Sequence, residues 1–125
     1  MRDPKTFGTK FGLPSTAAPT DRATMHDMWR GPVWINMNWL TAYGLEQYGH
    51  LSVAKELRQR TMIEVERWYL SAGCISEFYD QDGATSPEML PRKGRLENMS
   101  PFHQAIHDYG WTTTLYADLV YSSLK

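Results

Sequence analysis

Apolar residues crowd one stretch of the chain, between Pro32 and Gly49. They stand at positions 33, 34, 35, 37, 39, 40, 43, 45 and 48, so they surround a helix axis instead of forming one stripe. Gly31-Pro32 puts proline at a first helical position, where its missing N–H costs nothing. The pattern predicts a helix from Pro32 to near Gly49 that is enclosed on most sides, an inner helix.

A second pattern, from about Ser52 to Ala72, has the three-and-four spacing of a helix with one apolar face. That face carries Ala54, Leu57, Thr61, Val65, Trp68 and Ala72, and the charged positions are Lys55, Glu56, Arg58, Arg60, Glu64 and Glu66. The pattern predicts an outer helix with a solvated face.

A third helix is expected after Asp108, which is a candidate N-cap. Trp111, Leu115, Leu119 and Ser122 would lie on one side of it. No period persists from Gly73 to His107, and loops of that length are usually functional or disordered. We therefore divide the chain into an irregular approach segment, 1–31, and a helical part, 32–125, which includes a long loop, 73–109.

Composition narrows the function. The chain has 125 residues and a formal net charge of −1, which gives no bias toward nucleic acid or an anionic membrane. No apolar run approaches the ~20 residues that span a bilayer. The single cysteine and the absence of an apolar leader at Met1 favour a cytoplasmic location.

Aromatic residues make up 13% of the chain, so much aromatic surface must be buried or used in binding. Three helices supply too few neighbours to enclose the first one. Burying a large aromatic side chain is worth ~2–3 kcal/mol, a sizeable part of the ~5–15 kcal/mol by which domains are stable. We therefore expect an incomplete domain that either associates with itself or borrows its missing core from a partner.

The stretch MWRGPVWINMNWL, residues 28–40, holds the first candidate site. Trp29, Arg30 and Trp34 lie at the start of the first helix, where free N–H groups and the positive dipole end suit a neutral, hydroxyl-rich ligand. Indole faces pack against sugar rings, and Arg30, Asn36 and Asn38 can bond to hydroxyls. The alternative is that the tryptophans are core residues and the asparagines bond to neighbouring loops.

Glu77 is the second candidate, at the start of the long loop beside Phe78 and Tyr79. Its surroundings can set the orientation of the carboxylate for acid or base chemistry, although many such glutamates are simply solvated. His103 and His107 have the spacing of helical metal ligands, but no third ligand is evident, so no metal is expected. Nothing near Cys74 in the sequence would activate it as a nucleophile.

Four segments, WRGPVWINMNWL, GLEQYG, EFYDQDG and DYGWTTTLYADLV, resemble the C-terminal part of the catalytic domain of glycoside hydrolase family sixty-three and its bacterial relatives. These relatives include mannosylglycerate hydrolase-like and glycogen-debranching-like enzymes. The resemblance implies an all-α fold, a partial (α/α)6 toroid of the kind that arranges twelve helices in two concentric rings. It places the tryptophan-rich stretch beside the pocket at the centre of the ring.

The resemblance also implies a reaction, hydrolysis of an α-linked glucoside or related α-glycoside with inversion and without a cofactor. Glu77 falls on the family's general base, which activates a water while an acid ~6.5–9.5 Å away protonates the leaving oxygen. The resemblance assigns a sugar-contacting role to Trp29, Arg30, Trp34, Asn38, Tyr79 and Trp111.

This sequence departs from the family's pattern in three ways. It has no position that matches the family's acid, an aspartate upstream of WRGPVW. Gln81 stands where many relatives have proline, and the run 84–102 is extended. We therefore expect the isolated chain to be inactive. A non-catalytic carbohydrate-binding or interaction module, or a trehalase-like toroidal glycosidase, is the alternative.

Overall fold

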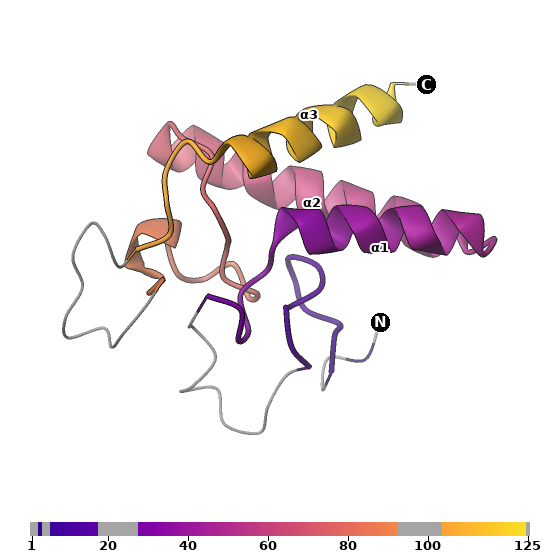
Figure 1. Cartoon of the computed structure of the whole chain (residues 1–125), viewed down its shortest axis with the longest axis horizontal. Coiled ribbons are helices and arrows are strands. Elements are labelled where there is room, and N and C mark those ends of the chain that lie inside the picture. Colours follow the sequence, from indigo (N-terminus) through magenta and orange to yellow (C-terminus); the bar gives the residue numbers. More distant parts are fainter. Residues whose placement is uncertain (1–2, 4–5, 18–27, 93–103, 125) are drawn as a thin grey trace.

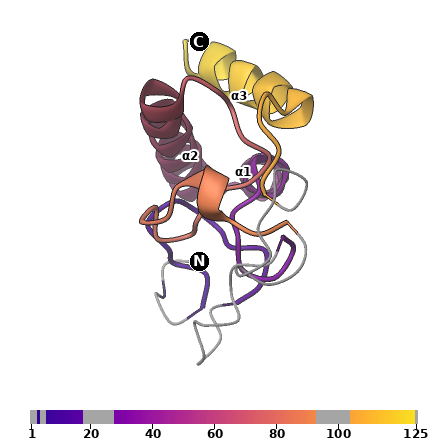
Figure 2. The ribbon, with the colours of Figure 1, turned by 90° about the vertical axis from the view of Figure 1, so that its left-hand side faces the viewer.

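The computed structural model describes residues 3, 6–17, 28–92 and 104–124. Within these ranges the chain is all-α, and its only β-type pairings are isolated bridges. The helices are α1 (Ile35–Gln47), α2 (Leu51–Ala72) and α3 (Gly110–Ser123), with a short 3-10 turn, η2 (Pro87–Met89). α1 and α2 run antiparallel as a hairpin, α3 lies beside them, and the irregular segments gather toward the end where α1 and α3 begin and α2 ends (Figures 1 and 2).

α1 begins at Ile35, so the prediction that it begins at Pro32 is wrong. Val33 forms antiparallel bridges with both Pro14 and Tyr79, and Trp34 is extended at the N-cap. The backbone groups of Val33 pair across the bridge and are not available to a helix. The helix ends at Gln47, two residues before Gly49, whose φ of 79° no longer belongs to a right-handed helix.

The predicted second helix is confirmed as α2, which starts one residue earlier than expected, at Leu51. It ends at a left-handed Gly73, whose N–H donates to the carbonyl of Tyr69. Glu64 departs from the prediction because it is buried, although the sequence pattern puts it among the charged positions. Arg67, three residues later, pairs with it and makes that burial tolerable.

The third helix is confirmed, but its cap is not. Tyr109 is the N-cap of α3, while Asp108 lies outside the helix with a left-handed φ of 52°. The buried residues of α3 are Thr112 and Leu119. Trp111 is 51% exposed, so the side of α3 that was expected to carry Trp111 and Leu119 is buried at Leu119 but open at Trp111.

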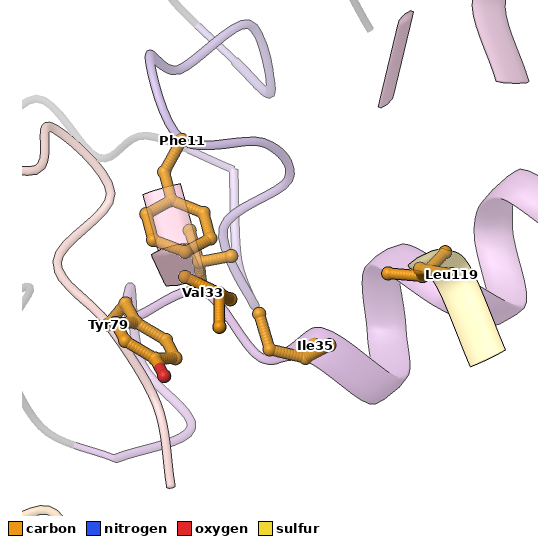
Figure 3. Close-up of a cluster of buried hydrophobic side chains, with 6 residues drawn as sticks. Phe11, Val33, Ile35, Tyr79 and Leu119 are labelled. Carbon is orange, nitrogen blue, oxygen red and sulfur yellow. The ribbon is translucent and has the colours of Figure 1, made fainter. Parts of the chain in front are cut away.

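The main core draws on the approach segment, the three helices and the loop after α2. Phe11, Val33, Ile35, Val65, Tyr79 and Leu119 form one buried cluster, of which Figure 3 labels five members. Phe11 stacks on Tyr79 with ring centroids 5.0 Å apart, and its N–H donates to the carbonyl of Gln81. The approach segment therefore packs into the core in spite of its irregular backbone.

The described part of the chain does not enclose α1. It buries Ile35, Asn38 and Ala42, but Leu40 is 58% exposed and Tyr43 is exposed as well. The described part of the chain therefore covers only part of the apolar surface that surrounds the axis of α1. None of the helices in the described ranges is long and apolar enough to cross a membrane.

Candidate active site

An antiparallel bridge holds the two candidate motifs side by side. The N–H of Val33 donates to the carbonyl of Tyr79 at 2.8 Å, and the N–H of Tyr79 donates back to Val33 at 3.0 Å. These residues are 46 positions apart, yet the bridge fixes the register between the tryptophan-rich stretch and the segment that carries Glu77. The neighbours of the bridged residues, Trp34 and Phe78, consequently pack together.

An aromatic stack forms one side of the site. Trp29 lies on Trp34 with ring centroids 3.7 Å apart and planes 3° from parallel, and Trp34 packs on Phe78 at 5.2 Å. Trp34 is 2% exposed, and its indole N–H donates to the carbonyl of Met28 at 2.9 Å. Trp29 is 43% exposed. The inner indole is thus a fixed core group, while the outer one keeps much of its ring surface exposed.

Glu77 lies below the surface, with 1% of its area exposed. Its Oε2 accepts a bond from Nε of Arg92 at 3.0 Å and a longer one from the N–H of Ile106 at 3.3 Å. Its Oε1 lies 3.3 Å from the same Nε. A buried carboxylate is costly unless it is paired and hydrogen-bonded, and Glu77 has both kinds of partner.

The backbone of Glu77 is also held on both sides. Its N–H donates to the carbonyl of Ile106 at 2.8 Å, and its own carbonyl accepts a bond from the hydroxyl of Thr112 at 3.2 Å. The residue is therefore tied to the returning segment before α3 and to the first turn of α3. A carboxylate with this many fixed contacts has a defined orientation, which general acid or base chemistry requires.

Arg92 is the residue that sequence reasoning missed. It lies in the extended run 84–102, and its guanidinium is the charged partner of Glu77. An ion pair between residues 15 positions apart in an aperiodic loop leaves no pattern in the sequence. The only signal in the sequence was that the run 84–102 is longer than the corresponding link in the simpler relatives.

The other predicted sugar contacts lie in different settings. Arg30 is exposed beside Trp29, and Trp111 is exposed next to Thr112, one position from a contact with Glu77. Tyr79 is fully buried, and its hydroxyl accepts a bond from the N–H of Ser76. Its contact with a sugar stays a prediction.

Asn38 is buried and already uses both ends of its amide. Nδ2 donates to the hydroxyl of Thr61 at 2.9 Å, and Oδ1 accepts from the N–H of Leu13 at 3.0 Å. These bonds join α1, α2 and the approach segment, as the alternative interpretation of the asparagines expects. A sugar contact of Asn38 also stays a prediction, and Asn36 uses its Oδ1 to accept a bond from the N–H of Met37.

Two weaker candidates have no support in the geometry. Among the residues that the structure describes, no group of three or more His, Cys, Asp or Glu side chains is placed to hold a metal ion. His107 is exposed, and His103 lies outside the described residues. Burial raises the pKa of the Cys74 thiol, and the Asp108 carboxylate raises it further, which disfavours the reactive thiolate.

The fold and the sequence define a class of protein, because the three helices form part of the (α/α)6 toroid of glycoside hydrolases. The crystal structure of a GH63 mannosylglycerate hydrolase from Thermus thermophilus in complex with glucose superposes with a TM-score of 0.55 at 25% identity, over 91% of this chain and 23% of that chain. The chain belongs to the mannosylglycerate hydrolase MGH1-like glycoside hydrolase domain family, whose model matches residues 1–112.

Curated relatives agree with this assignment over shorter stretches. A mannosylglycerate hydrolase from Thermus thermophilus is 46% identical over 39 residues, which cover 31% of this chain and 9% of the relative. The mannosyl-oligosaccharide glucosidase GCS1 of Arabidopsis thaliana is 35% identical over 57% of this chain and 10% of its own length. The match to this chain thus spans about a tenth of these two relatives.

Proposed function

We propose that this chain supplies the general base and part of the sugar-contacting wall of an inverting α-glycosidase domain. The observation that carries the proposal is the Val33–Tyr79 bridge, because it sets the stacked tryptophans and the fixed carboxylate of Glu77 in one register. A sugar platform and an oriented carboxylate are the two components that this half of a glycosidase site requires.

In the proposed reaction Glu77 takes a proton from a water, and that water attacks the anomeric carbon. A carboxylic acid elsewhere in the toroid protonates the leaving oxygen, so the configuration inverts. Trp29 offers its exposed indole to the apolar face of the sugar. Arg92 compensates the negative charge of Glu77 in its buried position.

The proposed substrates are α-linked glucosides and closely related α-glycosides. The matched relatives are named as a mannosylglycerate hydrolase and a mannosyl-oligosaccharide glucosidase, and a matched structure contains glucose. Glucose and mannose differ at one hydroxyl, and both present an apolar ring face to an indole. The extended run 84–102 differs from the simpler relatives close to Glu77, so we expect it to influence which aglycone is accepted.

We expect the 125-residue chain alone to hydrolyse no glycoside at a useful rate. General acid assistance is worth ~10²–10⁴-fold, and loss of the remaining pocket costs more through positioning. The exposed side of α1, with Leu40 and Tyr43, is where we propose that the rest of a toroid, or a second copy, covers the chain. Saturable turnover of an aryl α-glucoside by the isolated chain, abolished in Glu77→Gln, would contradict this expectation.

The test of the base uses a complete glycosidase domain that contains this sequence. Glu77→Gln keeps the shape of the side chain but cannot take a proton, so kcat should fall by several orders of magnitude while KM changes little. Glu64→Gln is the matched control, because Glu64 is also buried and paired with an arginine, and kcat should survive there. NMR of the first product should show the β anomer from an α-glycoside.

A Glu77→Gln enzyme with near-normal kcat, or a product of retained configuration, would overturn the proposal. One observation favours a non-catalytic sugar-binding module instead, namely that Glu77 is only 1% exposed in this chain. Such a module would bind an α-glucoside equally well before and after the Glu77→Gln substitution and would lose binding in Trp29→Ala. Turnover therefore separates the two candidates, whereas binding does not. A glycosidase hydrolyses an α-glycoside in the parent domain and loses kcat in Glu77→Gln, but a sugar-binding module hydrolyses none.

A further inference from the structure

Arg92 reaches Glu77 from a well-anchored backbone. Pro91 pairs with Gln104 in an antiparallel bridge, and the N–H of Ala105 donates to the carbonyl of Leu90 at 3.1 Å. Leu90 is fully buried and shares a cluster with Trp34, Phe78 and Ala105. The backbone just before Arg92 is thus fixed against the same aromatic groups that form the candidate site.

From this geometry we propose that Arg92 is a positioning residue for the carboxylate of Glu77. The inference rests on the proposed function, since it assigns Arg92 a role in holding the general base. Among the residues that the structure describes, Nε of Arg92 and the N–H of Ile106 both bind Oε2, which leaves Oε1 with one contact of 3.3 Å. A carboxylate oxygen has room for about two donors, so Oε1 retains capacity for the attacking water.

The fixed contacts have two consequences for a base. The two donors on Oε2 stop rotation of the carboxylate, so Oε1 keeps one direction relative to the sugar wall. The guanidinium also compensates a negative charge that is almost completely removed from solvent. The planar Nε–H of arginine supplies a directed bond here, whereas lysine would supply a mobile point charge.

The opposite role would give the opposite result. If the ion pair instead blocked Glu77 from water, removing Arg92 would free the base and raise the rate. Kinetics of Arg92 variants therefore distinguish positioning from obstruction, provided that effects on folding are measured separately.

The kinetic test again uses a complete glycosidase domain that contains this sequence. Arg92→Met should lower kcat about 10- to 100-fold, as expected for loss of a bond to a charged group, with KM within about threefold of the parent value. Arg92→Lys should recover part of the loss. Arg67→Met is the matched control, because Nε of Arg67 also binds a buried glutamate, Glu64, at 2.9 Å, and its kcat should be unchanged.

These outcomes separate the inference from the proposed function. If Glu77→Gln abolishes turnover but Arg92→Met leaves kcat unchanged or raises it, the positioning role is wrong and the base assignment stands. If Glu77→Gln has no effect, the proposed function itself fails. Equal losses in Arg92→Met and Arg67→Met would show a general structural effect and would also overturn the positioning role.

A second measurement needs no turnover and uses the 125-residue chain itself. The N–H of Ile106 reports the place of the carboxylate because it donates to Oε2 of Glu77. In ¹⁵N–¹H correlation spectra, Arg92→Met should shift the Ile106 resonance and speed its hydrogen exchange several-fold, and Arg67→Met should not. An Ile106 signal that ignores Arg92→Met would contradict the proposal.

Discussion

Substitution of Asn38 tests whether this residue of the tryptophan-rich stretch stabilises the fold or contacts a sugar. Asn38→Ala removes a bond to the hydroxyl of Thr61 and a bond from the N–H of Leu13. Each hydrogen bond contributes ~1 kcal/mol net, and the Leu13 N–H left without its partner adds ~1 kcal/mol or more. The expected loss is therefore about 2–4 kcal/mol, a large part of the ~5–15 kcal/mol of a typical domain.

Thermal unfolding followed by circular dichroism at the helix band measures this loss. For a chain of this size, 1 kcal/mol corresponds to ~3–5 °C, so Asn38→Ala should lower Tm by roughly 10 °C. Asn36→Ala is the matched control, because the Asn36 side chain accepts a bond from the adjacent N–H of Met37 and lies nearer the surface. That variant should cost only about 0.5 kcal/mol.

A double-mutant cycle assigns the loss to the side chains named. Thr61→Val keeps the shape of Thr61 but removes the hydroxyl that accepts from Asn38 and donates to the carbonyl of Leu57 at 2.8 Å. Its coupling with Asn38→Ala should be ~1 kcal/mol. A Tm for Asn38→Ala equal to that of Asn36→Ala, or no coupling with Thr61→Val, would refute the structural role and return Asn38 to the sugar wall.

Other parts of the fold give further predictions. Gly83 and Gly73 both have a left-handed φ, of 64° and 73°. A Cβ on Gly83 would lie 2.7 Å from Nη2 of Arg67 and 2.8 Å from Oε2 of Glu64, whereas a Cβ on Gly73 would meet open space. Gly83→Ala should therefore lower Tm by several degrees more than Gly73→Ala. Burial, and after it the Asp108 carboxylate, raise the pKa of the Cys74 thiol. At pH 8 iodoacetamide should therefore label Cys74 more slowly in the folded chain than in the unfolded chain, and Asp108→Asn should speed the labelling. Equal labelling rates in the folded and unfolded chains would contradict this prediction. Burial also raises the pKa of the Tyr79 hydroxyl above its unfolded value of ~10. The contribution of the neutral hydroxyl to stability is therefore complete below pH ~10 and is lost as the pH rises further. In denaturant titrations, the unfolding midpoint should be lower at pH 10.5 than at pH 8.

Periodicity predicted the three helices because it depends on residues three and four apart along the chain. The bounds of α2 were predicted to within one residue at its start and correctly at Ala72, where Gly73 stops the helix. The prediction of where α1 begins failed for a non-local reason, because Val33 pairs with Tyr79, 46 positions away. No local rule about proline at a first helical position contains that information.

The sequence predicted those residues of the candidate site that lie within its recognisable motifs. Trp29, Trp34 and Glu77 came from the sequence, and the structure brings their segments together. Arg92 was not predictable, because its ion pair with Glu77 depends on how an aperiodic loop folds back. The burial of Glu64 was missed for a related reason, since Arg67 and the turn at Gly83 make the site that accepts it.

The crowding of polar and indole groups at the start of α1 follows from the neighbours that each of them meets. Trp34 and Asn38 face inward, where Phe78 and Thr61 fix them, and they hold three separate segments in place. Trp29 stacks on Trp34 but keeps an exposed area, so a buried residue orients an accessible one. A ligand at Trp29 would then meet a surface whose geometry was set before binding, and such preorganisation reduces the entropy lost on association.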